Sequence, residues 1–189
     1  NGWNVKVFYQ NPILQANEIF WCQLIMHEDN MSDIQIRFAT VDDVSGIMPI
    51  FAQTVDYHAS IDPEVYTDAD MSAFEKCIQD QRSKDNWKIF VAELDDKIVG
   101  FLTLQMRHNR RQYGNVADSD GHIDCLAVDE KYRHMGIGTK LMIALEDYLK
   151  SQGIFEMRLT VSVHNPNAIK CYEKMGMKTY IYSMRKELK

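Results

Sequence analysis

Apolar residues recur at two different spacings along this chain, and the spacing separates predicted strands from predicted helices. Alternation at every second position, or a short apolar run between turn residues, is typical of a strand. Apolar residues three or four positions apart are typical of a helix that buries one face. These spacings predict strands over residues 34–38, 87–94, 97–106, 122–128, 155–161 and 179–184, and helices over residues 41–55, 70–82, 137–149 and 166–175.

Local signals set several boundaries of these elements. Thr40, with Asp43 three positions later, is similar to a capping box at the start of the first helix. Asp95 begins a two-residue turn between the second and third strands, which indicates a hairpin. Residues 56–63 and 107–121 lack periodicity, so we expect loops there, and long loops are often functional.

The composition indicates one well-cored domain. Hydrophobic residues make up 46% of the 189 residues, which is enough for a sizeable core. The net charge of −6 and the isoelectric point of about 5.5 argue against nucleic acid or an anionic membrane as the main partner. No apolar run approaches the roughly 18 residues that a membrane span needs. We therefore expect no nucleic-acid partner and no membrane partner.

The cysteines and histidines indicate neither disulfides nor a metal. Cys22, Cys77, Cys125 and Cys171 lie far apart and form no C-x-x-C pair. This pattern suits a reducing cytoplasm, where disulfide frameworks are rare. The six histidines show no metal-ligand spacing. We expect a cytoplasmic protein without a metal.

Residues 1–30 differ from the rest, and we interpret them as an N-terminal extension ahead of a domain over residues 31–189. No secretory signal can be read in them, and Met31 directly precedes the first predicted strand. One interpretation is an upstream extension without a role in the domain. The other is an arm that packs on the domain or on a second subunit, which leaves a homodimer open.

A strand, a basic turn with two glycines and a helix follow one another between residues 122 and 149. The first N–H groups of a helix have no intrahelical partner and the helix dipole adds partial positive charge there, so such a turn suits phosphate. Gly136 and Gly138 let the backbone come close to a ligand, and Arg133 adds a cation. A P-loop is absent, and Leu141 stands where a dinucleotide fingerprint needs its third glycine.

Two motifs resemble those of the GCN5-related N-acetyltransferases, the GNAT family. The first is R-x-x-G-x-G from Arg133, after a strand that ends Leu-Ala-Val, and it is similar to the family's acetyl-CoA-binding motif. The second is N-x-x-A-x-x-x-Y-x-x-x-G from Asn165 to Gly176. The resemblance covers about residues 33–188. It implies the GNAT fold, an α/β architecture in which helices flank a central mixed sheet.

The resemblance also implies acetyl-CoA as co-substrate. In the family, the amides of the turn hold the CoA pyrophosphate, and the end of the preceding strand pairs with the pantetheine arm. The residues implied to bind it are Leu126, Ala127, Val128, Arg133, His134, Met135, Gly136, Ile137, Gly138, Thr139, Asn165 and Asn167. Either asparagine also suits the cap of the helix that follows.

Acetyl transfer to an amine needs a base for the amine proton, an acid for the leaving thiolate and donors for the carbonyl oxygen. The resemblance assigns the acid to Tyr172, for which the alternative is a core tyrosine. The family places a glutamate at the position of either His122 or Asp124, so both are candidate bases. The alternative for His122 is a solvent-facing residue at the start of a strand, and the alternative for Asp124 is a helix cap or an ion-pair partner. Period-two alternation predicts one shared face for His122, Asp124, Leu126 and Val128. The Val128 amide is the implied oxyanion donor.

We therefore expect an acetyl-CoA-dependent N-acetyltransferase that acts by direct attack of a primary amine in a ternary complex. Carboxylates near the expected acceptor mouth favour a small cationic amine, and they are Asp56, Asp62, Glu64, Asp118 and Asp120. The alternative is ordinary solvated loop charge. The rival acceptor is a protein or peptide amine, at an N-terminus or a lysine. Outside the enzymes, the rival is an acyl-CoA-binding regulatory module without turnover.

Overall fold

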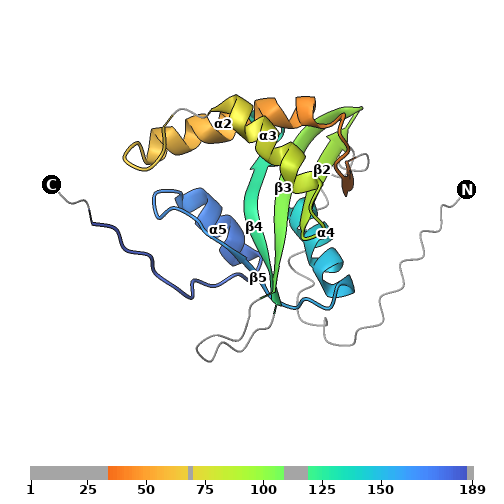
Figure 1. Cartoon of the computed structure of the whole chain (residues 1–189). Coiled ribbons are helices and arrows are strands. Elements are labelled where there is room, and N and C mark those ends of the chain that lie inside the picture. Colours follow the sequence, from red (N-terminus) through yellow and green to blue (C-terminus); the bar gives the residue numbers. More distant parts are fainter. Residues whose placement is uncertain (1–33, 68–69, 109–118, 187–189) are drawn as a thin grey trace, which may run out of the picture. The chain divides into compact units, whose positions relative to one another are not determined.

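The computed structural model describes residues 34–67, 70–108 and 119–186 (Figure 1). The predicted extension over residues 1–30 lies outside the described residues and stays a prediction. No helix in the described ranges is both long and apolar enough to cross a membrane. The elements are β1 (Gln35–Phe38), α2 (Val44–Ile61), α3 (Met71–Arg82), β2 (Trp87–Leu94), β3 (Lys97–His108), β4 (Ser119–Val128), η2 (Glu130–Tyr132), α4 (Ile137–Ser151), β5 (Met157–Leu159) and α5 (Pro166–Lys174).

The described strands form one mixed sheet in the order β1-β2-β3-β4-β5. The first three pairs are antiparallel, and β4 pairs with β5 in parallel. The hairpin between β2 and β3 turns at Asp95 and Asp96, whose φ angles of 49° and 59° are those of a tight two-residue turn. Helices lie along the chain before β2, after β4 and after β5, so the predicted α/β fold class with a mixed sheet is confirmed.

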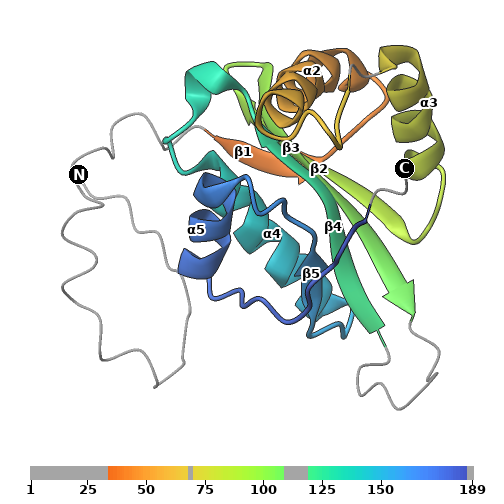
Figure 2. The ribbon, with the colours of Figure 1, turned by 90° about the vertical axis from the view of Figure 1, so that its left-hand side faces the viewer.

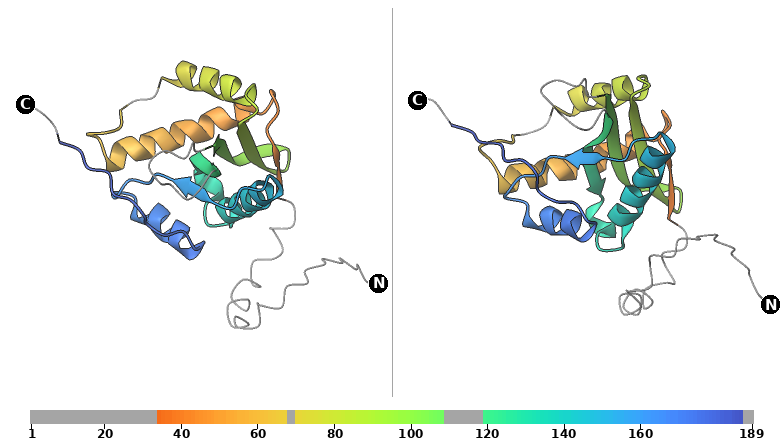
Figure 3. Two further views of the ribbon diagram at one scale, coloured as in Figure 1. Left: turned by 60° about the horizontal axis from the view of Figure 1, so that its bottom comes forward. Right: turned by 90° about the horizontal axis from the view of Figure 1, so that it is seen from below.

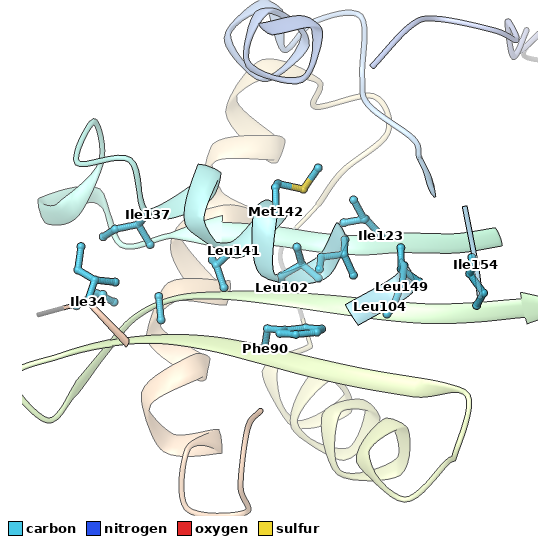
Figure 4. Packing of buried hydrophobic residues seen from close by; sticks show 13 residues of the cluster. Ile34, Phe90, Leu102, Leu104, Ile123, Ile137, Leu141, Met142, Leu149 and Ile154 are labelled. Atoms are coloured by element: carbon cyan, nitrogen blue, oxygen red, sulfur yellow. The ribbon is translucent and has the colours of Figure 1, made fainter. Parts of the chain in front are cut away.

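Helices cover both faces of this sheet (Figures 2 and 3). Helices α2 and α3 lie over one face and contribute Ile47 and Ile78 to a buried cluster that includes Phe101. Helix α4 lies over the other face, where its side chains form a second cluster with the sheet (Figure 4). Its buried members recur at helical spacing on one face, and they are Ile137, Leu141, Met142, Leu145 and Leu149.

Two glycines let α4 approach the sheet closely. A Cβ on Gly121 of β4 would lie 2.6 Å from the Leu149 methyl carbons. A Cβ on Gly100 of β3 would lie 3.1 Å from both the Ala127 carbonyl oxygen and a side-chain carbon of Ile137. The start of α4 is thereby fixed against the end of β4.

A charged cluster holds the junction of β1 and α2. Asp43 is 7% exposed, and it accepts hydrogen bonds from the Arg37 guanidinium at 2.7 and 2.8 Å. It also accepts from the Thr40 N–H at 2.6 Å, while Glu93 on β2 pairs with Arg37. The hydrogen bonds from Arg37 hold the pKa of the Asp43 carboxyl well below its usual range. The predicted capping box is thus half correct, because Asp43 bonds back to Thr40 but is itself the N-cap of α2 and makes no side-chain cap bond there.

Helix α2 is longer than predicted, since it continues to Ile61. The expected loop over residues 56–63 is wrong for most of its length. Tyr57 and Ile61 lie one helical turn apart and are half-buried, so they extend the inward-facing stripe of the helix. The polar residues between them hid this continuation.

The predicted loop over residues 107–121 is shorter than expected. Strands β3 and β4 both extend into it, and only residues 109–118, which include Asp118, lie outside the described residues. Arg107 lies opposite Asp120 in the register, and opposite charges at facing positions stabilise an antiparallel pair. The backbone ladder between β3 and β4 therefore continues where the sequence shows no apolar alternation.

Residues 179–184 form no strand, so the predicted closing strand is wrong. Their side chains are exposed, at 65% for Tyr180 and 86% for Tyr182. The Arg158 guanidinium of β5 lies 5.4 Å from the centre of the Tyr180 ring. Strand β5 is likewise shorter than the predicted 155–161. Alternation alone does not make a strand, because each strand needs a hydrogen-bonded neighbour.

Candidate active site

Strand β4 carries a bulge in the middle of the predicted site. In its pairing with β3, Cys125 lies opposite Thr103 and Ile123 lies opposite Leu104, so Asp124 is an extra residue on β4. The Cys125 N–H donates to the hydroxyl oxygen of Thr103 at 3.0 Å. The Asp124 side chain is exposed.

The bulge reverses the alternation of side chains along β4. Before the bulge, Ile123 belongs to the core cluster under α4, and after it Leu126 and Val128 pack against that same cluster. Cys125 and Ala127 instead pack in the cluster under α2 and α3. Odd-numbered residues therefore face α4 before the bulge and even-numbered residues face it afterwards.

The predicted face shared by His122, Asp124, Leu126 and Val128 is consequently wrong. Neighbouring strand residues point to opposite faces, so His122 faces the α2 side, opposite to Ile123. The alternation rule fails here because it assumes a strand without an inserted residue.

Beyond the bulge, β4 has an open edge. Strand β5 pairs only with residues 121–123 of β4. Within the described part of the chain, residues 124–128 have no strand partner on that side. This open edge is the segment that the resemblance assigned to the pantetheine arm.

Backbone groups along a strand point alternately to its two edges. The N–H groups of Cys125 and Asp129 both donate to groups of β3, each at 3.0 Å. The N–H groups of Leu126 and Val128 therefore point to the open edge. The Val128 carbonyl oxygen accepts from Arg133 Nε at 3.2 Å, which holds that arginine beside the edge.

Strand β4 leads through η2 into the glycine turn. His134 and Gly136 have φ angles of 68° and 74°, which produce a sharp turn into α4. The Lys140 N–H donates to the Gly136 carbonyl oxygen at 3.0 Å. The N–H groups of residues 137–139 precede that bond and have no acceptor within the helix. They form a cradle of donors at the positive end of the helix dipole.

The side chains of the turn leave space in front of this cradle. A Cβ on Gly138 would meet only Val128, at 3.9 Å, so packing inside the protein does not require glycine there. Met135 and Ile137 pack in the α4 cluster and can offer only backbone groups to a ligand. The exposed side chains of the turn are those of Arg133, His134 and Thr139.

Helix α5 begins at the second motif. The Asn165 side-chain carbonyl oxygen accepts from the Ala168 N–H at 3.1 Å, so Asn165 is the helix cap. The same oxygen accepts from the Tyr57 hydroxyl of α2 at 3.2 Å. Asn167 is exposed in the first turn. Tyr57 is a residue that sequence reasoning missed, because its helix was expected to end before it.

Tyr172 projects from α5 toward the central strand. Burial, followed by the neighbouring thiols of Cys125 and Cys171, raises the pKa of Tyr172 to about 12. The phenol is therefore protonated at neutral pH and acts as a donor. Burial, with a smaller contribution from Asp124, raises the pKa of the Cys125 thiol to about 12 as well. Cys125 is thus a neutral neighbour of Tyr172 rather than a nucleophile.

His122 lies at the other side of the bulge from this pair. Burial and then the charge of Arg107 lower the pKa of His122, while Asp124 and Asp120 act in the opposite direction. Its Nδ1 atom is buried and has no hydrogen-bond partner among the described residues. A neutral imidazole with a lone pair is able to accept a proton.

Several carboxylates expected at the acceptor mouth are engaged within the protein. Asp62 accepts from the Ser162 hydroxyl at 3.3 Å. Glu64 pairs with Arg185 at 3.0 Å, and Asp120 lies 3.7 Å from Arg158. The two arginines offset the charge of Glu64 and Asp120, whereas the Ser162 hydroxyl offers Asp62 no positive charge.

The molecule also has a hollow that lies away from this site. A hollow of about 570 Å³ lies between α2 and the β2–β3 hairpin. Three of the charged residues at its wall, Arg37, Asp43 and Glu93, are paired with one another. No group of three metal-ligating side chains occurs within the described ranges.

Comparison with known proteins places these features in a family. The model of the acetyltransferase (GNAT) family matches residues 51–177. An N-alpha-acetyltransferase of Sulfurisphaera tokodaii is 37% identical over 93 residues, which are 47% of this chain and 55% of that protein. The chain thus spans about half the length of that relative. A glucosamine 6-phosphate N-acetyltransferase of Trypanosoma brucei brucei is 24% identical over 82% of this chain and 97% of its own length.

Solved structures show the same fold. A mutant of the BH1408 protein from Bacillus halodurans has a TM-score of 0.77 at 21% identity, over 82% of this chain and 99% of that one. Glucosamine-6-phosphate N-acetyltransferase from Arabidopsis thaliana has a TM-score of 0.60 at 23% identity, over 82% and 99%. The family match includes β4, the glycine turn and the helix of Tyr172 in one span, and this chain therefore belongs to the acetyltransferase (GNAT) family.

Proposed function

We propose that this protein transfers the acetyl group of acetyl-CoA to a primary amine by direct attack in a ternary complex. The observation that carries the proposal is the open edge of β4, which runs directly into the donor cradle of α4. A thioester arm and its pyrophosphate need such a continuous path of donors. Because the Cys125 thiol is neutral, direct attack is favoured over an acetyl-cysteine intermediate.

The backbone of β4 and the turn supplies the binding groups. The N–H groups of Leu126 and Val128 face the open edge and are the candidates for contact with the arm and for the carbonyl oxygen of the thioester. The Ala127 side chain packs under α2 and α3, so Ala127 affects binding only by holding the backbone of β4 in place. Arg133 and the N–H groups of residues 137–139 suit the pyrophosphate.

Tyr172 is the candidate donor to the leaving sulfur. Its phenol is protonated across the neutral range, and the Cys125 thiol is close enough to contribute to the raised pKa of Tyr172. A donor at this position stabilises the thiolate as the carbon–sulfur bond breaks.

His122 is the stronger candidate for the base. It carries a buried nitrogen without a hydrogen-bond partner among the described residues, and its lowered pKa keeps it neutral near pH 7. Asp124 is exposed at the bulge, so it is the second candidate, acting through water.

We propose a small cationic amine as acceptor, which the net charge of −6 supports. A peptide N-terminus is the second candidate, because two relatives from Sulfurisphaera tokodaii and Saccharolobus solfataricus are named N-alpha-acetyltransferase. The Ser162 hydroxyl offers Asp62 no positive charge, and the Glu64–Arg185 pair is exposed, so the proposal of a cationic acceptor rests mainly on the overall charge of the protein.

Thiol release from acetyl-CoA should distinguish these acceptors. The panel contains a polyamine, an amino sugar phosphate, a peptide with a free N-terminus and the same peptide with its N-terminus blocked and one lysine. We expect kcat/KM to be at least about tenfold higher for the polyamine, since a tenfold change needs only about 1.4 kcal/mol of preferential binding. Preference for the free N-terminus would select the second candidate. Intact acetyl-CoA binding without any turnover would indicate a regulatory module.

Replacing Gly138 by aspartate should abolish acetyl-CoA binding without harming the fold. A Cβ at Gly138 meets no close neighbour, and a negative charge in the first turn stabilises a helix, but the carboxylate would lie where the pyrophosphate is proposed to bind. Wild-type protein should gain about 2.7 kcal/mol of stability at a hundredfold excess over the dissociation constant, measured by thermal denaturation. Gln152→Glu, at the far end of α4, adds the same charge and should keep the gain. An equal gain in Gly138→Asp would refute the assigned cradle.

Tyr172→Phe should lower turnover by roughly 10²–10⁴-fold, the usual contribution of general acid catalysis. The phenyl ring keeps the packing of α5, so acetyl-CoA binding and the melting temperature should remain close to wild type. The measurement is kcat with one accepted amine, normalised to the acetyl-CoA-binding fraction. A core tyrosine would give the reverse pattern, with stability lost and kcat retained.

The pH dependence of kcat/KM should identify the base. The pKa of His122 lies below the ordinary value of about 6.5, so its active, neutral form is lost only as the pH falls below that value. The kcat/KM of the wild-type protein should therefore fall as the pH is lowered. His122→Gln should lose this acid-side decrease, and its kcat/KM should be roughly 10²-fold or more lower than that of the wild type. The acid-side decrease is called the acid limb of the profile. Asp124→Asn is the matched control and should retain the limb. The opposite assignment follows if only Asp124→Asn removes it.

A further inference from the structure

Thr103 on β3 is a polar residue in an apolar layer. It is 1% exposed, and it lies between Ile89 of β2 and Cys125 of β4 in the register of the sheet. Its neighbour two positions earlier, Phe101, belongs to the cluster under α2 and α3. A valine would fit the pleated surface of such a strand equally well, so the hydroxyl calls for a physical explanation.

The explanation lies in the bulge of β4. The register of β3 shifts between Thr103 and Leu104, at the point where Asp124 is inserted opposite. There the Cys125 N–H donates to the Thr103 hydroxyl oxygen at 3.0 Å. A side chain thus accepts a hydrogen bond from the backbone where the bulge disturbs the ladder. A buried N–H group is costly to leave without an acceptor, so this bond favours the bulged register over alternatives.

The position of the bulge decides which backbone groups face the open edge. With the bulge, the N–H groups of Cys125 and Asp129 point to β3, and those of Leu126 and Val128 point away from it. In an unbulged strand that kept the pairing before the bulge, this alternation would be inverted beyond Asp124. Cys125 would then also leave the layer in which it lies near Tyr172.

We propose that Thr103 is a positioning residue for acetyl transfer, because its hydroxyl fixes the bulge that directs the Leu126 and Val128 amides to the open edge. Thr103 itself is buried and touches neither substrate. This inference rests on the proposed function for its effect on turnover, but its effect on acetyl-CoA binding can be measured separately.

The test compares Thr103→Val, which keeps shape and removes the hydroxyl, with Thr103→Ser, which keeps the hydroxyl. Thr40→Val is the matched control, since its hydroxyl bonds Asp43 at the β1 edge of the sheet at 2.9 Å. The readouts are the dissociation constant for acetyl-CoA by calorimetry, and kcat and KM with one accepted amine, each per folded molecule. We expect Thr103→Val to lose roughly 10- to 100-fold in kcat/KM, the effect of a misplacement near 1 Å, and to bind acetyl-CoA more weakly. Thr103→Ser should recover to within about threefold, because it restores the acceptor for the Cys125 N–H.

Each outcome decides the inference. Loss of melting temperature in Thr103→Val with unchanged acetyl-CoA affinity and kcat would show a purely structural role and overturn it. Failure of Thr103→Ser to recover would overturn it too, since shape rather than the hydroxyl would matter. If Thr103→Val does not fold, Thr103→Cys keeps the volume with a weaker acceptor and is measured in the same way. If wild-type protein binds acetyl-CoA but turns over no amine, the proposed function fails, and the calorimetric comparison still tests Thr103.

Discussion

The site depends on the backbone of β4, which leaves one edge unpaired after residue 123 and yet keeps its extended conformation. The core under α4 fixes Leu126 and Val128 on one side, and the core under α2 and α3 fixes Cys125 and Ala127 on the other. Strand β5 turns away after three pairs. Packing on both faces therefore keeps the strand rigid where hydrogen bonds on one edge are missing.

The features that the sequence predicted correctly are those set by interactions between residues close together along the chain. The strand, glycine turn and helix from residue 122 onward were predicted because glycine, caps and helical spacing act within a few residues. Asn165 caps α5, as its position indicated. Asp70, at the predicted start of the second helix, caps α3 by accepting from the Ala73 N–H at 3.0 Å. These features need no knowledge of the rest of the fold.

What the sequence did not predict depends on partners far along the chain. The bulge at Asp124 exists only in the pairing of β4 with β3, and its acceptor Thr103 shows no signal in a single sequence. The extension of α2 is supported by Tyr57, whose hydroxyl bonds Asn165 at 3.2 Å. The closing strand failed for the same reason, since Tyr180 and its neighbours alternate correctly but find no edge.

The burial of Tyr172 has a consequence for the fate of the proton. An ordinary thiol has a pKa of about 8.5, whereas the Tyr172 phenol has a pKa of about 12. Complete transfer of the proton to a departing thiolate would thus be unfavourable by roughly three to four powers of ten. If Tyr172 is the proposed donor, its phenol would stabilise the departing thiolate through a hydrogen bond while it keeps its own proton, and the thiolate would take up a proton from bulk water. The tyrosine would then end each cycle in the protonation state in which it began, and no step would be needed to reload it.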